Sequence, residues 1–226
     1  CVALGTATFI MQASESVISI CFNASLLKYG DDIAVGAMTI LSSVMQFAML
    51  PLQGIAQGSQ PITSYNYGAR NSARVRQTFR LLVKVCLCYS VALWAIIQLF
   101  PGIFTQIFTP NADLVAFTVP ALRVYCAALF LFGIQIACQM TFVSIGYAVC
   151  SIIVAVLRKF ILLLPLIYLL PHLLTDQTMA VYTAEPVADA IAVTCTAILF
   201  GVQFHKAMQK LEQEAETQNS PASDAR

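Results

Sequence analysis

Charged side chains are scarce in this sequence. They make up 10% of the 226 residues, whereas an average soluble domain has about 25%. Hydrophobic residues make up 59%, which is more than a soluble core of this size can bury. The net charge is only +1, and nucleic-acid binding requires a concentrated basic face. The composition therefore excludes an ordinary soluble domain and gives no support for a nucleic-acid partner.

Paired cysteines and central histidines are also lacking. The eight cysteines are scattered through apolar runs without the spacing of a zinc site or a disulfide framework, so we interpret them as small buried hydrophobic residues. An intramembrane enzyme needs a nucleophile with a base, or paired catalytic acids, but His172 and His205 lie at the ends of apolar runs. We expect no metal site, no bound cofactor and no enzyme activity.

Six long apolar stretches dominate what is present. Each is long enough to cross about 30 Å of hydrocarbon as a helix. Open sheets would leave unpaired backbone groups in lipid. We therefore predict an all-α integral membrane protein in which residues 1–206 form a six-helix lobe and 207–226 a polar, partly disordered cytoplasmic tail. The predicted spans are 2–27, 33–60, 78–100, 113–139, 146–170 and 177–203.

Basic residues predict the orientation, because short cytoplasmic loops are rich in Lys and Arg. The connector between the second and third spans holds four arginines, and the tail holds Lys206 and Lys210. In the connectors after the first, third and fifth spans, Lys28 is the only lysine or arginine. We expect both ends of this chain to face the cytoplasm across a plasma (inner) membrane. The chain begins at Cys1 inside an apolar run, without signal-peptide features, and we interpret it as a fragment.

Glu15 is the most informative ionisable residue, because a charge within a span is costly and marks a functional candidate. Gln12, Ser19 and Asn23 fall on the same helical face. Such a stripe is typical of a water-filled cavity in which the acid binds a proton, a sodium ion or a cationic substrate. The structural alternative is a hydrogen-bonded seam between helices.

Amide side chains mark two further faces. Gln46, Gln53 and Gln57 recur along the second span, and Gln135 and Gln139 lie four apart in the fourth. We treat all five as candidates for lining a substrate cavity. Side-chain amides also join membrane helices at about 1 kcal/mol per contact, so helix association is the alternative.

The remaining charges suggest an ion-paired network within the membrane, formed by Arg123, Arg158, Glu185 and Asp189. Glu185 and Asp189 share one helical face, and we favour their pairing with an arginine over a direct transport role. Arg158 and Lys159 are adjacent and diverge by about 100° on an α-helix. We therefore expect them to point in different directions.

One stretch carries a specific resemblance. The sequence reads PLQGIAQGSQPI from Pro51 and SYNYGARN from Ser64, and this string resembles the multidrug-and-toxin-extrusion (MATE) family, with weaker similarity at Arg158 and around Glu185. The likeness is best to the bacterial branch and to the second, C-terminal lobe of its two six-helix lobes. The residues that carry it are Gly54, Gln57, Gly58, Gln60, Pro61, Asn66, Tyr67, Gly68 and Ala69.

The resemblance implies an antiporter that exports small organic, often cationic, compounds in exchange for sodium ions or protons. Its partners would be the lipid bilayer and an N-terminal six-helix lobe missing from this chain. Some members bind sodium through an acid on the first helix of this lobe and another on its fourth. Glu15 fits the first position, whereas the fourth predicted span has no mid-span acid.

Two other functions remain open. A flippase for lipids or lipid-linked oligosaccharides has related architecture and would favour a basic cavity, for which Arg123, Arg158 and Lys159 are the relevant residues. A non-transporting membrane assembly subunit is the alternative of another class. Loss of every mid-span acid without a phenotype would favour that role.

Overall fold

The computed structural model describes residues 2–147, 153, 155–173 and 176–219, and the side chains of 16–29, 32–147, 153, 155–173 and 176–214. All regular structure in these ranges is helical. The elements, in chain order, are α1 (Val2–Gly68), α2 (Ser72–Leu99), α3 (Pro101–Phe108), α4 (Ala112–Tyr125), the 3-10 helix η1 (Leu129–Leu131), α5 (Phe132–Ser144), the π-helix η2 (Leu157–Leu163), α7 (Leu164–Leu173) and α8 (Gln177–Asn219).

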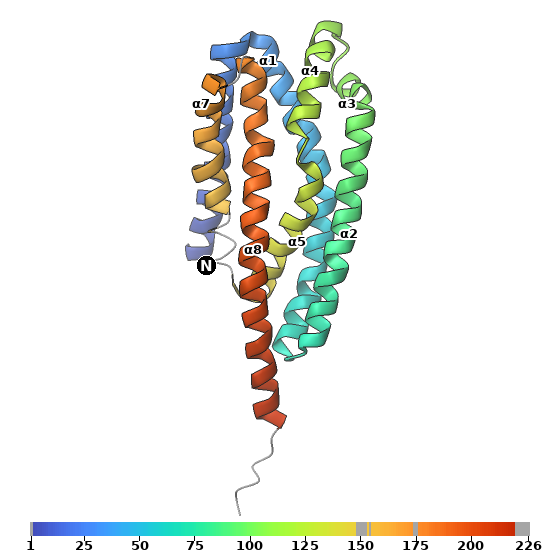
Figure 1. The fold of residues 1–226 in the computed structure, drawn as a ribbon, viewed down its shortest axis with the longest axis vertical. Helices are drawn as coiled ribbons and strands as arrows, with labels where there is room; N and C mark the ends of the chain where they lie inside the picture. Colours follow the sequence, from blue (N-terminus) through green and yellow to red (C-terminus); the bar gives the residue numbers. More distant parts are fainter. Residues whose placement is uncertain (1, 148–152, 154, 174–175, 220–226) are drawn as a thin grey trace, which may run out of the picture.

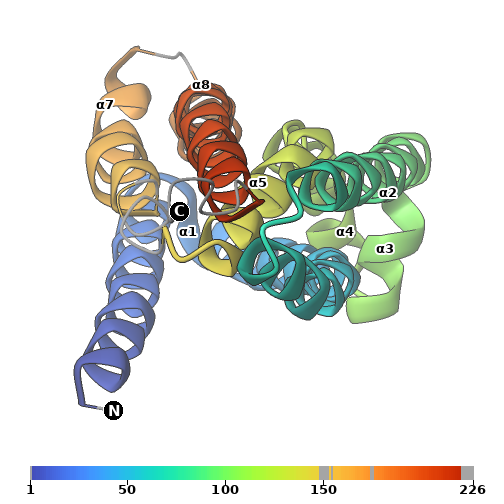
Figure 2. The same cartoon turned by 90° about the horizontal axis from the view of Figure 1, so that it is seen from below.

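The helices form an elongated bundle. Figure 1 shows α1 rising in dark blue, turning over at the top and descending in lighter blue. Its two arms hold the apolar segments Ser16–Tyr29 and Asp32–Gly68. In Figure 2, which is seen along the long axis, α8 lies between α7 and α5. The helices α2 and α3 lie on the side of the bundle opposite α7. The chain therefore runs up and down the long axis, as the alternation of apolar stretches and connectors predicts.

Three helices in the described part of the chain are long and apolar enough to cross a membrane: Asp32–Gly68, Ser72–Leu99 and Gln177–Glu214. A fourth candidate is the pair Ala112–Tyr125 and Leu129–Ser144, which meet at a 41° bend. These overlap four of the six predicted spans. The side chains of the first part of the predicted span 2–27, up to residue 15, lie outside the described residues. The predicted span 146–170 contains backbone that is not described, so six spans stay a prediction.

The reversal between α1 and α2 is formed by the end of the family-like motif. Arg70 has a φ of 57°, in the left-handed region that few non-glycine residues adopt. The backbone N–H of Asn71 bonds the carbonyl of Asn66, and the Asn71 side chain accepts from the N–H of Arg74 to cap α2. The Asn66 side chain donates to the carbonyl of Ile62 at 2.8 Å. These bonds end one long helix and begin the next within a few residues.

A close approach joins α5 to α2. A Cβ built on Gly133 would lie 2.6 Å from the backbone oxygen of Cys86, so only glycine fits there without a backbone shift. Ser90 strengthens the contact by donating to the carbonyl of Phe130 at 3.0 Å. Small residues that let helix backbones approach are typical of packing between membrane helices.

The C-terminal part of α8 is longer than expected. The composition predicts a tail from residue 207, whereas α8 continues to Asn219. Met208 and Leu211 are buried in a second, basal hydrophobic cluster with Val75 of α2. Glu212 also contacts α2, through Arg76 at 3.0 Å and the hydroxyl of Ser72 at 2.9 Å. Apolar burial and ion pairing therefore keep this polar segment helical along the base of the bundle.

Candidate functional site

A buried cluster of one arginine and two carboxylates lies where η2 packs against α8. Arg158 donates from Nε to Oδ1 of Asp189 at 2.5 Å and from Nη2 to Oε1 of Glu185 at 3.0 Å. The two acids are four residues apart on α8, which places both on one helical face. The side chain of Asp189 is 2% exposed and that of Glu185 is 11% exposed, whereas that of Arg158 is 21% exposed. One guanidinium therefore contacts two largely buried carboxylates on the same helical face.

Two further contacts complete this ion cluster. The guanidinium of Arg158 lies over the ring of Phe132, 5.0 Å from its centroid, a cation–π distance. The second oxygen of the Asp189 carboxylate, Oδ2, is buried and has no hydrogen-bond partner among the described residues. Buried polar atoms are nearly always paired. Oδ2 is therefore an available hydrogen-bond acceptor within the cluster.

A cavity of about 130 Å³ adjoins the cluster. Its walls come from both arms of α1, the end of α4, η2 and α8, so segments far apart in the sequence meet there. Serines, a tyrosine, two basic residues and one acid supply its polar atoms. The lining residues are Ile18, Ser19, Phe22, Met38, Ser42, Tyr125, Arg158, Lys159, Leu163 and Glu185.

Arg158 and Lys159 both line this cavity, although adjacent residues on a helix point in different directions. Both residues belong to the π-helix η2, residues 157–163. A π-helix has a wider turn than an α-helix, is rare, and is frequent at functional sites. This segment contributes two adjacent cationic side chains to the cavity lining, a feature that hydrophobic periodicity does not reveal.

The predicted first-helix face is only partly described. Ser19 lines the cavity, whereas Asn23 is half-buried and is not among the lining residues. The side chains of Gln12 and Glu15 lie outside the described residues. Glu15 therefore remains a prediction, with a neighbour one turn away at the cavity wall.

None of the five candidate glutamines lines the central cavity. Gln46, Gln53 and Gln57 are exposed along the descending arm of α1. Gln135 is 5% exposed, with an unpaired side-chain oxygen within the described structure, and Gln139 is half-buried. In this lobe the amides of the second span thus face outward, and the first amide of the fourth faces inward.

Arg123 is not brought to the cluster. It is exposed near the end of α4, and its backbone carbonyl accepts a hydrogen bond from Gln98 at 2.9 Å. Tyr125, two residues later, lies at the cavity instead. Sequence reasoning missed Tyr125 and Phe132, since neither differs in the sequence from other aromatic residues of apolar helices.

Six residues of the family-like motif fall into two groups. Gly54 and Gly58 are exposed on α1, and a Cβ at either would have no neighbour within 4 Å. Asn66, Tyr67, Gly68 and Ala69 belong to the reversal into α2. Within the described residues, no group of three or more His, Cys, Asp or Glu side chains could hold a metal ion.

This bundle, with its apolar spans and a charge cluster beside a central cavity, is that of a multi-pass membrane protein. Residues 7–169 match the sequence model of the MatE family. Because the match covers most of the chain, the protein belongs to the MatE family, whose members are transporters and not enzymes.

Relatives agree with this assignment. The chain is 23% identical over 192 residues to the multidrug export protein MepA of Staphylococcus haemolyticus strain JCSC1435, covering 84% of this chain and 42% of MepA. It superposes with a TM-score of 0.85 on a crystal structure of a MATE protein in the bent conformation, at 19% identity over 92% of this chain and 46% of that one.

A third comparison is the inward-facing conformation of a multidrug resistance MATE family transporter of the MOP superfamily. Its TM-score is 0.83 at 19% identity, covering 92% of this chain and 47% of that one. The chain thus spans about half the length of the proteins it matches. The fold is that of half a MATE transporter.

Proposed function

We propose that this chain is the C-terminal lobe of a bacterial two-lobed antiporter that exports small organic, often cationic, compounds in exchange for sodium ions or protons. The carrying observation is the ion cluster beside the central cavity, because ionisable residues within membrane helices are rare and costly and mark substrate or ion pathways. The family and the half-length match support a second lobe outside this sequence.

The coupling residue in this proposal is Glu15. Ser19 lines the cavity, and helical spacing assigns residue 15 to the same face one turn earlier. A cation or proton on this acid changes the balance between outward-facing and inward-facing states only through its different affinity for the two. The ion cluster of Arg158, Glu185 and Asp189 holds one more carboxylate than cation and is the fixed charged group beside the same cavity.

The exposed face of the descending arm of α1 supports the two-lobed arrangement. Gln46, Gln53 and Gln57 lie there with exposed Phe47 and Leu50. Amides are costly when they face lipid without partners. We therefore assign this face to the boundary with the N-terminal lobe, where the glutamines would contact substrate.

The charge balance favours efflux over a flippase function. A flippase cavity should be basic, but Arg158 is neutralised by two carboxylates and Arg123 is absent from the cavity. Lys159 also engages a partner. The wall is therefore mixed in charge, which suits a pathway for cations more than a site for a lipid pyrophosphate.

In the proposed topology the predicted six spans and both chain ends follow the positive-inside rule. Figure 1 places the α1–α2 reversal and the end of α8 at the same end of the bundle. Arg70, Arg76 and Lys206 all belong to this end. We assign it to the cytoplasmic face of the plasma (inner) membrane.

Two experiments test the function. Sequencing upstream of the codon for Cys1 should reveal a reading frame with six further apolar spans; a nearby start codon after a stop would refute the two-lobed proposal. In the complete transporter, Glu15→Gln should abolish drug resistance in an efflux-deficient host without reducing membrane insertion. Asp113→Asn, at an exposed acid on the first turn of α4, is the matched control and should retain resistance. Full resistance in Glu15→Gln would remove Glu15 from the coupling role.

A further inference from the structure

A second cavity opens between α2 and α8 and shares no residue with the central cavity. Its volume is about 330 Å³, within the roughly 300–1,000 Å³ typical of ligand pockets. The lining combines three basic or titratable side chains with apolar surface. The residues are Arg76, Phe79, Arg80, Gly201, Phe204, His205 and Met208. We refer to this cavity as the basal pocket.

The apolar side of the basal pocket is formed by aromatic rings that pack against one another. The rings of Phe79 and Phe200 stack with centroids 4.6 Å apart, and Phe200 stacks on Phe204 at 4.9 Å. Phe79 also contacts Phe204 at 5.2 Å. Met208 is buried in the same hydrophobic cluster. Aromatic stacks and buried neighbours hold these walls in place before any ligand binds.

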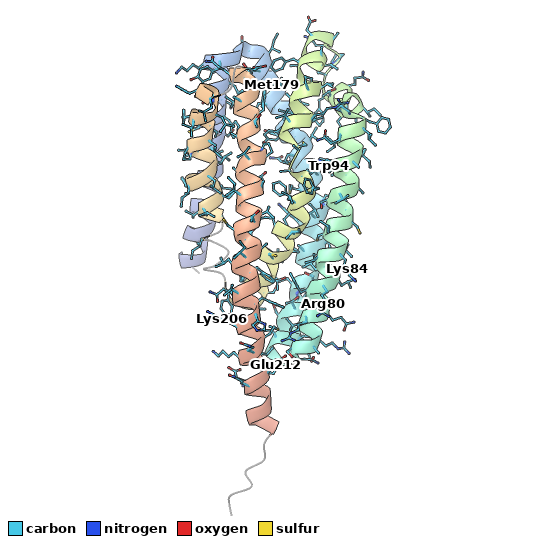
Figure 3. All side chains as sticks on the ribbon, viewed as in Figure 1. Arg80, Lys84, Trp94, Met179, Lys206 and Glu212 are labelled. Atoms are coloured by element: carbon cyan, nitrogen blue, oxygen red, sulfur yellow. The ribbon has the colours of Figure 1, made fainter. Side chains whose placement is uncertain are left out.

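The charges of the pocket are unbalanced. Arg76 is paired with Glu212 at 3.0 Å, so its charge is largely offset. Arg80 is exposed and makes no ion pair or hydrogen bond with any described residue. Figure 3 shows Arg80 and Lys84 on α2 and Lys206 and Glu212 on α8, all toward the lower end of the bundle. The pocket therefore offers at least one uncompensated cation to an anionic ligand.

The position of the pocket fits the interface between lipid headgroups and hydrocarbon. Arg80 lies on the third turn of α2, about 12 Å along the axis from Ser72 at a rise of about 1.5 Å per residue. Further from this end, Val85 of α2 and Ile198 and Val202 of α8 are exposed apolar side chains. A ligand with an anionic head and apolar chains could thus contact charged and hydrophobic surfaces together.

We propose that the basal pocket binds the phosphate headgroup of an anionic phospholipid, with Arg80 and His205 at the phosphate and the acyl chains along α2 and α8. Basic pockets between membrane helices are known to hold such headgroups. A free phosphate ion would use only the charged half of the lining. The phenylalanines, Met208 and the exposed apolar residues beyond them favour a lipid.

The test is native mass spectrometry of the 226-residue chain released from detergent micelles containing phosphatidylglycerol or phosphatidylcholine. We expect one phosphatidylglycerol molecule to remain bound in preference to phosphatidylcholine. Arg80→Gln should weaken this binding about fivefold, since a cation near a lipid phosphate contributes about that factor, and Arg80→Lys should retain most of it. Lys84→Gln removes an exposed charge one turn away that does not line the pocket, and should bind as the unchanged chain does.

Three outcomes would overturn the proposal. Equal retention of the two lipids would show that the headgroup charge is not recognised. An equal loss in Lys84→Gln and Arg80→Gln would indicate diffuse surface charge instead of a pocket. Displacement of phosphatidylglycerol by inorganic phosphate at equal concentration would identify a site for free anions. The result does not depend on transport, so failure of the efflux proposal leaves it intact.

Discussion

Arginine–carboxylate pairs occur in two regions of this lobe, and the two regions differ in exposure. In the ion cluster at the centre, Arg158 is 21% exposed and its partners are 11% and 2% exposed. At the base, Arg76 and Glu212 join α2 to α8 with side chains that are 39% and 44% exposed. The same kind of ion pair thus occurs once largely buried and once exposed.

The difference in setting changes what each pair does. A buried pair offsets a large desolvation cost, so removing one partner strands a charge in an apolar environment. An exposed pair exchanges water for a partner at almost no net gain. Substitutions in the central pairs should therefore change the stability of the bundle strongly. The basal pairs should add little to the contact between α2 and α8, which apolar packing already makes.

The largest effect is expected from breaking the central cluster. Arg158→Met leaves Glu185 and Asp189 without their cation, and removing one partner of a buried ion pair costs about 3–5 kcal/mol. We expect a sharp fall in the apparent unfolding temperature of the purified chain in detergent, measured by tryptophan fluorescence or differential scanning fluorimetry.

A triple variant separates charge from packing in this experiment. Arg158→Met with Glu185→Gln and Asp189→Asn removes all three charges and should recover most of the stability. If the triple variant is as unstable as the single one, the loss comes from packing, including the contact with Phe132, and the charge explanation fails.

A steric change in the interior should have the next largest effect. Gly133→Ala places a Cβ 2.6 Å from the carbonyl oxygen of Cys86, and overpacking of this kind costs about 1–3 kcal/mol. Gly201→Ala is the matched control near the base, because a Cβ added there would have no atom within 4 Å. Alanine is favoured over glycine in a helix by up to about 1 kcal/mol, so the control should be neutral or slightly stabilising in the same thermal assay. Similar losses in both variants would contradict a specific α2–α5 contact.

The sequence predicts the helices well where apolar runs are long. The segments 33–60, 78–100 and 177–203 each lie within or largely within a candidate membrane helix. Glu185 and Asp189 can be placed on one face because helical spacing alone determines it. Their partner cannot be chosen between Arg123 and Arg158, because periodicity within a helix carries no information about which helices become neighbours.

Other features depend on tertiary context. The π-helix that holds the cavity-lining residues Arg158 and Lys159 is a local departure from α-helical spacing. Gln135 is a sequence candidate for the cavity wall but is buried elsewhere, and Gln46 faces outward. The end of α8 has the polar composition of a tail, whereas contacts of Met208 and Leu211 with α2 support a helix there.

The smallest effect is expected at the base. Arg76→Gln removes one exposed pair with Glu212, and such pairs contribute about 0.2–1 kcal/mol. The loss should shrink further as salt is raised, because exposed charges are screened over about 8 Å at physiological ionic strength. Thermal unfolding of Arg76→Gln and Arg158→Met at low and at high salt measures the size of each stability loss and its dependence on salt. A salt-independent loss of stability in Arg76→Gln as large as that in Arg158→Met would mean that exposure does not determine the contribution of these pairs. It would also mean that α8 is held against α2 mainly by charge instead of by the apolar contacts of Met208 and Leu211.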